Sequence, residues 1–249
     1  MFEMADIHSH TLGGVDDGAK NYEEMNKMLD IAYNDGIRHI CFTPHFKIYH
    51  FRNSNEINQY NQVINESFEK AKEYASSTYP DLNLYLGNEV MYHSGVIDSS
   101  DSNRCRRMNG GSYMLVEFQP NISIYEMRNA VSKILRCGFI PVIAHVERYG
   151  ELLKKPNFAW DLKQYGALLQ VNASTVVKAK FGKTAAFLKF LFKKSYIDVI
   201  ASDAHSTDTY KPVLSKARDK VIKKYGESVA KRIFLDTPLA IINNKKLFN

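Results

Sequence analysis

The chain has 249 residues, of which 45% are hydrophobic and 24% charged, and its formal net charge is +6. This composition is that of a globular protein, so a disordered chain is excluded. The length suits a single domain over 1–249, and an α/β barrel falls in this size range. No basic region precedes an apolar run at the start, and no apolar stretch approaches about 18 residues, so we expect neither a signal peptide nor a membrane span.

Apolar strands alternate with amphipathic helices along the chain. The first helix begins at Asn21 with Glu24 three residues later, as in a capping box, and it ends at Gly36. Ser123 and Glu126 begin a later helix in the same way. The expected strands are 4–7, 39–43, 82–90, 113–118, 140–144, 168–172 and 198–202. The other expected helices are 56–75, a shorter one that ends near Gly166, 185–194, 214–225 and 228–234, and 92–111 is expected to be irregular.

Repeated β/α units imply parallel strands with right-handed crossovers, which form either a barrel or an open doubly wound sheet. No Gly-x-Gly-x-x-Gly or Walker loop follows the first strand, which argues against a nucleotide-binding sheet. The pattern therefore predicts a short, distorted α/β barrel.

His8 and His10 follow the first strand and are two residues apart. Along an extended backbone, such residues point to the same side, so both imidazoles can reach one metal ion. The glycine-rich segment 13–18 is a flexible turn that could bring Asp17 back over the same place. This motif alone is a weak signal, so the prediction depends on partners elsewhere in the chain.

Metal-ligating residue types stand at or just beyond the ends of six of the seven expected strands. In a parallel barrel these ends meet on one face, where the active site is built. The set consists of His8, His10, Asp17, His45, Glu89, Glu117, His145, Asp203 and His205. Five histidines and four carboxylates are too many for one tetrahedral ion and suit two or three ions of Mn²⁺, Fe²⁺ or Zn²⁺ rather than Ca²⁺.

Closely spaced ions of this kind favour phosphoryl chemistry. They lower the pKa of bound water to near neutrality, so we expect a metal-bridging hydroxide to attack phosphorus in line. Arg148, three residues beyond His145, could bind phosphate oxygens bidentately, although a surface ion pair with Glu147 or Glu151 is the simpler interpretation. Asp17 or a metal-bound water could supply the proton for the leaving group.

The cysteines and lysines exclude other function classes. Cys41, Cys105 and Cys137 are odd in number and scattered, which is typical of a reducing cytoplasm, and none begins a Cys-x5-Arg phosphatase loop. The late lysines carry no nucleic-acid-binding signature, so we expect no nucleic-acid partner. They are interpreted as solvated helix faces, or as a field that attracts an anionic substrate or a membrane-proximal partner. The two groups are Lys178, Lys180, Lys183, Lys189, Lys193 and Lys194, and Lys220, Lys223, Lys224, Lys231 and Arg232.

Seven short motifs, taken together and in order, resemble one known family. They are Asp-Ile-His-Ser-His, Val-Asp-Asp-Gly, Thr-Pro-His, Gly-Asn-Glu, Val-Glu-Phe, Ala-His-Val-Glu-Arg-Tyr and Ala-Ser-Asp-Ala-His. The sequence resembles the PHP (polymerase and histidinol phosphatase) superfamily over about 6–238, and specifically its bacterial protein-tyrosine phosphatases, which act with capsule and exopolysaccharide tyrosine kinases.

The resemblance implies a distorted (β/α)7 barrel with three divalent ions, typically manganese, and a phosphotyrosine protein, a bacterial tyrosine kinase, as partner. His8, His10, Glu89 and Asp203 would hold one ion; Glu89, Glu117 and His145 a second; Asp17, His45 and His205 a third. Arg148 matches the phosphate-binding arginine. A second catalytic arginine often follows Asp-x-His in these phosphatases, and here Lys211 is the nearest basic residue.

Two alternatives stay open at this point. A histidinol-phosphate or other small phosphomonoester phosphatase would use the same scaffold and ligand set. A non-catalytic phosphotyrosine-binding partner with a structural metal would account for the missing arginine.

Overall fold

The computed structural model of the protein describes residues 2–93 and 104–247, so the expected irregular segment 92–111 lies partly outside the described residues. The strands are β1 (Met4–Asp6), β2 (Ile37–Phe42), β3 (His45–Phe46), β4 (Asn83–Leu86), β5 (Glu89–Met91), β6 (Tyr113–Glu117), β7 (Ile140–Ile143), β8 (Leu168–Asn172) and β9 (Val199–Ala201). The helices are α1 (Tyr22–Asn34), α2 (Ser54–Thr78), α3 (Ile124–Arg136), α4 (Gly150–Lys154), α5 (Phe158–Gln164), α6 (Ala173–Lys178), α7 (Gly182–Lys193), α8 (Ser215–Tyr225), α9 (Glu227–Lys231) and α10 (Thr237–Ile242). Single turns η1 (Ile48–His50), η2 (Met108–Gly110) and η3 (Val146–Arg148) are 3-10 helices, and η4 (Arg232–Asp236) is a π-helix.

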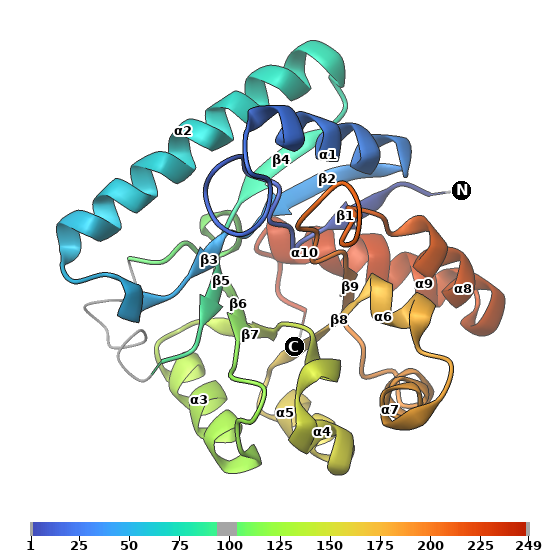
Figure 1. Ribbon diagram of the computed structural model, residues 1–249. Coiled ribbons are helices and arrows are strands. Elements are labelled where there is room, and N and C mark those ends of the chain that lie inside the picture. The colour runs from blue at the N-terminus through green and yellow to red at the C-terminus, as the bar shows by residue number, and fades with distance from the viewer. Residues whose placement is uncertain (1, 94–103, 248–249) are drawn as a thin grey trace.

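All strand pairs are parallel, and the strands lie at the centre with the helices outside them (Figure 1). The strand orders are β1-β2-β4 in one sheet and β3-β5-β6-β7-β8-β9 in the other. Backbone hydrogen bonds join the two sheets at two places: Asp203 N, after β9, donates to His8 O, after β1, at 2.9 Å, and Glu89 N of β5 donates to Thr43 O, after β2, at 3.2 Å. The sheet therefore curls, and the prediction of a parallel α/β fold is confirmed.

One of the expected strands is interrupted. The expected strand 82–90 is wrong as one element, because Gly87 and Asn88 separate β4 from β5. At Asn88 the side chain donates to Pro44 O at 2.8 Å and accepts from Arg106 N at 2.7 Å, so these side-chain bonds replace the ladder there. Pro44, which has no N–H to donate, separates β2 from β3 in the neighbouring strand. The breaks move β3 and β5 into the second sheet and leave Glu89 at the start of β5.

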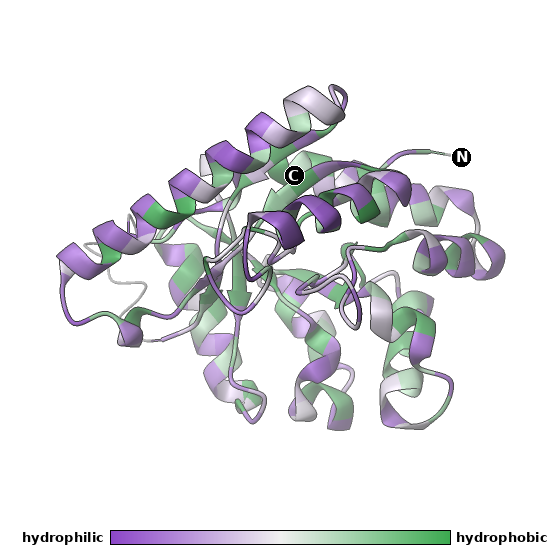
Figure 2. Ribbon diagram, turned by 45° about the horizontal axis from the view of Figure 1, so that its top comes forward, coloured by the Kyte–Doolittle hydropathy of each residue, from purple (hydrophilic) through white to green (hydrophobic). Residues whose placement is uncertain are grey.

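Alternate residues of the sheet pack into two apolar layers. Tyr113 and Leu115 of β6 and Val142 of β7 belong to an inner cluster inside the curl. Their neighbours along the strands, such as Met114 and Val116, pack outward against the helices. Apolar residues on both faces are expected for a parallel sheet covered on both sides. Figure 2 shows the hydrophobic strands within a shell of helices that turn hydrophilic residues outward, the long helix α2 most clearly.

The helix starts were predicted well where a cap is local. Ser123 and Glu126 form the expected capping box of α3, whose buried Met127, Val131 and Ile134 pack inward. The shorter helix expected to end near Gly166 is confirmed as α5, whereas α4, which precedes it across Pro156, was not anticipated. Helices α6 and α10 were not anticipated either, because their β-branched residues and Pro238 disfavour helix locally. Within the described residues, no helix has both the length and the apolar character needed to cross a membrane.

Asp35, at the end of α1, binds the start of α8. Its carboxylate accepts from Leu214 N at 2.6 Å and Ser215 N at 2.8 Å, and it also hydrogen-bonds the Ser215 hydroxyl. We expect Asp35→Ala to lower the free energy of unfolding by about 1–3 kcal/mol, because N–H groups at this helix start lose their acceptor. Urea denaturation measures the change, with Glu69→Ala, on the exposed Lys72 pair, as the control. Equal stability of the two variants would contradict this role for Asp35.

Candidate metal centre

The nine predicted ligand residues lie together at one end of the curled sheet. Each has a nitrogen or carboxylate oxygen within 4 Å of another member of the set. They come from the segments that follow β1, β7 and β9, from the first residues of β3 and β5, from the last residue of β6, and from the loop before α1. The parallel topology, which brings these ends to one face, is the reason that residues so far apart in sequence meet.

Glu89 lies at the centre of the group and is buried. Its Oε1 is 3.3 Å from His8 Nε2 and 3.0 Å from His145 Nε2. Its Oε2 is 3.3 Å from His10 Nε2 and 3.0 Å from His45 Nδ1. One buried carboxylate therefore faces four imidazoles.

The other predicted ligands lie at different depths, from the buried part of the group to its solvent-exposed side. Asp203 Oδ1 is 3.2 Å from His8 Nε2 in the buried part. At the open side, Asp17 Oδ1 lies 3.4 Å from His45 Nε2 and 3.6 Å from His205 Nε2, and the Asp17 side chain is 65% exposed. The centre is thus buried on the side of Asp203 and accessible to solvent on the side of Asp17.

Two ligand positions have left-handed backbone. His145, two residues after β7, has φ 31°, and Asp203, two residues after β9, has φ 55°. Non-glycine residues rarely adopt this conformation, and where they do, it often marks a functional site. At both positions the turn places the side chain in the cluster instead of continuing the strand direction.

Gly18 allows the first loop to close over the site. A Cβ at this position would lie 1.7 Å from the carbonyl oxygen of His10, so no larger residue fits without moving the backbone. The closed loop points the two aspartates at different residues. Asp17 faces His45 and His205, while Asp16 contacts His10.

Three supporting residues were missed by the sequence analysis. Asp16 Oδ2 is 2.7 Å from His10 Nδ1, and Gln170 Oε1 is 3.1 Å from His8 Nδ1. Asn172 Nδ2 donates to Asp203 Oδ2 at 2.7 Å. Such partners fix the tautomer and orientation of ligands. Two polar residues at alternate positions of the buried strand 168–172 were the available signal, whereas nothing in the sequence distinguished Asp16 from Asp17.

The electrostatics favour positive charge in the buried part of the group. Burial lowers the pKa of His8, but Glu89 and Asp203 outweigh burial and raise it to about 9. Burial raises the pKa of Asp16, but the contact with His10 outweighs it and lowers the pKa to about 2. The carboxylates therefore create a field that stabilises a cation at this place.

The donor set fits divalent metal ions. His8 Nε2 and His10 Nε2 face each other at 3.2 Å, and one shared cation can use both lone pairs. Glu117 Oε2 and His145 Nδ1 are buried without a hydrogen-bond partner among the described residues. Three groups converge closely enough to hold an ion: His10, Asp17, His45 and His205; His8, His10 and Asp203; His45, Glu89 and Glu117. Mixed nitrogen and oxygen ligands suit Mn²⁺, Fe²⁺ or Zn²⁺.

Of the two predicted basic residues, Arg148 contacts the ligand cluster and Lys211 does not. Arg148 Nη2 is 2.6 Å from Asp203 Oδ2, and its side chain is 44% exposed, so it borders the group from above. The surface ion pair with Glu147 or Glu151 is wrong, because Glu147 is buried and Glu151 pairs with Lys154. Lys211 is exposed and lines a neighbouring cavity of about 470 Å³ rather than the ligand cluster.

Comparison with known proteins gives the family. The model of the family "Capsular polysaccharide synthesis, CpsB/CapC" matches residues 4–243. The chain belongs to the CpsB/CapC family. The tyrosine-protein phosphatase CpsB of Streptococcus pneumoniae is 34% identical over 244 residues, 96% of this chain and 98% of that protein. CpsB of Streptococcus agalactiae serotype III is 28% identical over 246 residues, 97% of this chain and 99% of that protein.

The fold of this CpsB/CapC chain also matches a solved structure. It comes from a study of YwqE from Bacillus subtilis and CpsB from Streptococcus pneumoniae, described as unique metal-dependent tyrosine phosphatases. The TM-score is 0.85 at 24% identity, with 98% of this chain and 96% of that chain covered. The similarity establishes a shared fold over nearly the whole chain.

The central position of Glu89 makes it the sharpest test of the ligand group. We expect Glu89→Gln to lose bound metal and most of the increase in melting temperature that Mn²⁺ gives, because the amide removes the charge that four histidines face. Metal analysis and thermal unfolding measure both effects. Glu66→Gln, an exposed change on α2, is the control. Full metal content in Glu89→Gln would contradict the assignment.

Proposed function

We propose that this protein is a metal-dependent protein-tyrosine phosphatase that hydrolyses phosphotyrosine. The observation that carries the proposal is the ligand cluster around Glu89 with Arg148 at its open side. Membership of the CpsB/CapC family and relatives named tyrosine-protein phosphatase support the substrate. We also propose that residues 1–249 form one domain in the cytoplasm, and that the substrate is a bacterial tyrosine kinase of capsule or exopolysaccharide synthesis.

We propose three Mn²⁺ ions, with Fe²⁺ or Zn²⁺ as alternatives. The three converging groups support this number. Glu89 belongs to one of them and also contacts His8 and His10 of the others, while His145 lies 3.6 Å from Glu117. We further propose a distorted (β/α)7 barrel as the scaffold, in which β2 with β3, and β4 with β5, each count as one broken strand. The hydrogen bond from Asp203 N to His8 O supports closure between β9 and β1.

When bound, the ions would activate water and neutralise charge on the phosphoryl group. Arg148 binds the non-bridging phosphate oxygens, because its guanidinium has five N–H donors and the described contact with Asp203 uses one of them. Asp203 orients this guanidinium. The departing phenolate, whose pKa of about 10 makes it a good leaving group, would take its proton from Asp17 at the open side or from water held in the site.

Lys211 has a lesser role in this proposal. Its exposed position in the loop after β9 allows a point charge near the mouth but not the bidentate fork of an arginine. We therefore assign the equatorial oxygens to Arg148 and treat Lys211 as an outer electrostatic contribution.

Metal removal tests the function directly. Chelation with EDTA should abolish hydrolysis of a phosphotyrosine peptide and of p-nitrophenyl phosphate, and added Mn²⁺ should restore both. Under the same conditions, kcat/KM for histidinol phosphate should be lower than for the phosphotyrosine peptide. Full activity after verified metal removal would contradict the proposal. A preference for histidinol phosphate, or peptide binding without phosphate release, would favour one of the two alternatives.

Substitution of Arg148 tests its part separately. Arg148→Ala should lower kcat/KM for p-nitrophenyl phosphate by about 100-fold or more, because a charge-stabilising donor is lost. Arg148→Lys should recover only part of this loss. Metal content should stay unchanged in both variants, and Arg128→Ala on the exposed face of α3 is the control. Unchanged kcat/KM in Arg148→Ala would contradict the assigned role.

A further inference from the structure

A hollow of about 620 Å³ lies beside Arg148 and continues away from the ligand cluster. Its walls come from α6, the start of α7 and the segment between them, with Tyr210 from the loop after β9. Because Arg148 borders both the hollow and the metal centre, a group that binds in the hollow lies next to the reacting phosphate. We call its edge over residues 178–184 the 178–184 segment.

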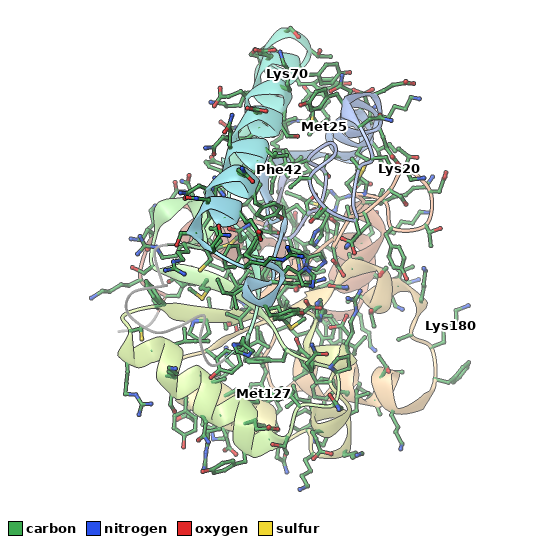
Figure 3. All side chains as sticks on the ribbon, turned by 60° about the vertical axis from the view of Figure 1, so that its left-hand side comes forward. Lys20, Met25, Phe42, Lys70, Met127 and Lys180 are labelled. Atoms are coloured by element: carbon green, nitrogen blue, oxygen red, sulfur yellow. The ribbon has the colours of Figure 1, made fainter. Side chains whose placement is uncertain are left out.

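The hollow has the opposite charge to the centre beside it. The residues that line it include Arg148, Lys178 and Lys180 and no carboxylate. The neighbouring centre is rich in carboxylates, Glu89 and Asp203 among them. Figure 3 shows Lys180 extending outward from the body of the protein, where its ammonium group can meet an approaching partner. The positive charge of this hollow would therefore attract an anionic group.

Aromatic side chains stand beside these cations. Phe181 is 90% exposed at the start of α7, and Tyr210 is 47% exposed across the hollow. Both aromatic side chains line the same hollow as Lys178 and Lys180, so apolar surface and positive charge meet in one place. Cations with interleaved aromatics bind an acidic peptide through charge and packing together.

We propose that the 178–184 segment binds the peptide that flanks the phosphotyrosine and selects substrates with Asp or Glu beside the modified tyrosine. This inference rests on the proposed phosphatase function and names the part of the substrate that sets specificity. Lys178 and Lys180 attract the acidic side chains, Phe181 packs on the peptide, and Arg148 holds the phosphate. A small aryl phosphate reaches Arg148 and the ligand cluster without touching the 178–184 segment.

The experiment uses the Mn²⁺-loaded full chain with three substrates. These are a phosphotyrosine peptide with acidic flanks, the same peptide with neutral flanks, and p-nitrophenyl phosphate. The wild type should prefer the acidic peptide by about tenfold in kcat/KM, and added salt should reduce the preference. Lys178→Glu/Lys180→Glu should abolish the preference for the acidic peptide by raising KM for that peptide, and it should leave p-nitrophenyl phosphate hydrolysis unchanged. Phe181→Ala should raise KM for both peptides but not for p-nitrophenyl phosphate.

The matched control reverses the same charge elsewhere. Lys193→Glu/Lys194→Glu changes two exposed lysines at the far end of α7, about 17 Å along a helix of this length. We expect this variant to keep the wild-type preference. An equal loss in the control would overturn the inference, and so would an unchanged preference in Lys178→Glu/Lys180→Glu or a parallel loss on p-nitrophenyl phosphate.

A binding assay separates this inference from the proposed function. Fluorescence anisotropy with both labelled phosphopeptides measures affinity without turnover. If the wild type hydrolyses no phosphotyrosine substrate, the proposed function fails, and affinity alone decides the docking. The inference is supported if the wild type binds the acidic peptide more tightly than the neutral one and Lys178→Glu/Lys180→Glu removes this difference. Equal affinities of the wild type for the two peptides would overturn it.

Discussion

The buried carboxylate of Glu89, faced by four imidazoles, is the constraint on which the rest of the structure depends. A charge without water needs partners of opposite charge, and the chain supplies nitrogen donors from three different segments to surround it. The interruptions at Pro44 and Gly87–Asn88 serve this arrangement, because they bring His45 and Glu89 into register as partners in β3 and β5. Left-handed backbone at His145 and Asp203 completes it from the other side.

Much of the fold could be predicted from local pattern. Capping at Asn21 and Ser123 and the apolar strands gave the alternation of strand and helix, since these signals depend on near neighbours. The break at Asn88 could not be predicted, because its hydrogen bonds go to residues 44 and 106. For the same reason α6 was missed: packing against α8 and β8 holds a segment whose β-branched residues do not favour helix.

The candidate site shows the same division. Strand ends and parallel topology were enough to name nine side chains that the structure brings together, because that convergence follows from the fold class. The supporting contacts of Asp16, Gln170 and Asn172 depend on side-chain direction, which sequence does not give. The basic hollow beside Arg148 was equally hidden, since the late lysines suggested only a general field until α6 and α7 placed two of them next to the catalytic face.

Anomalous diffraction from crystals grown with Mn²⁺, measured at the manganese absorption edge, tests the central claim most directly. The account expects manganese peaks bound by Glu89 together with His8, His10, His145 and Asp203, and a further peak at Asp17, His45 and His205. Absence of any peak at Glu89, with these side chains turned away from one another, would contradict it.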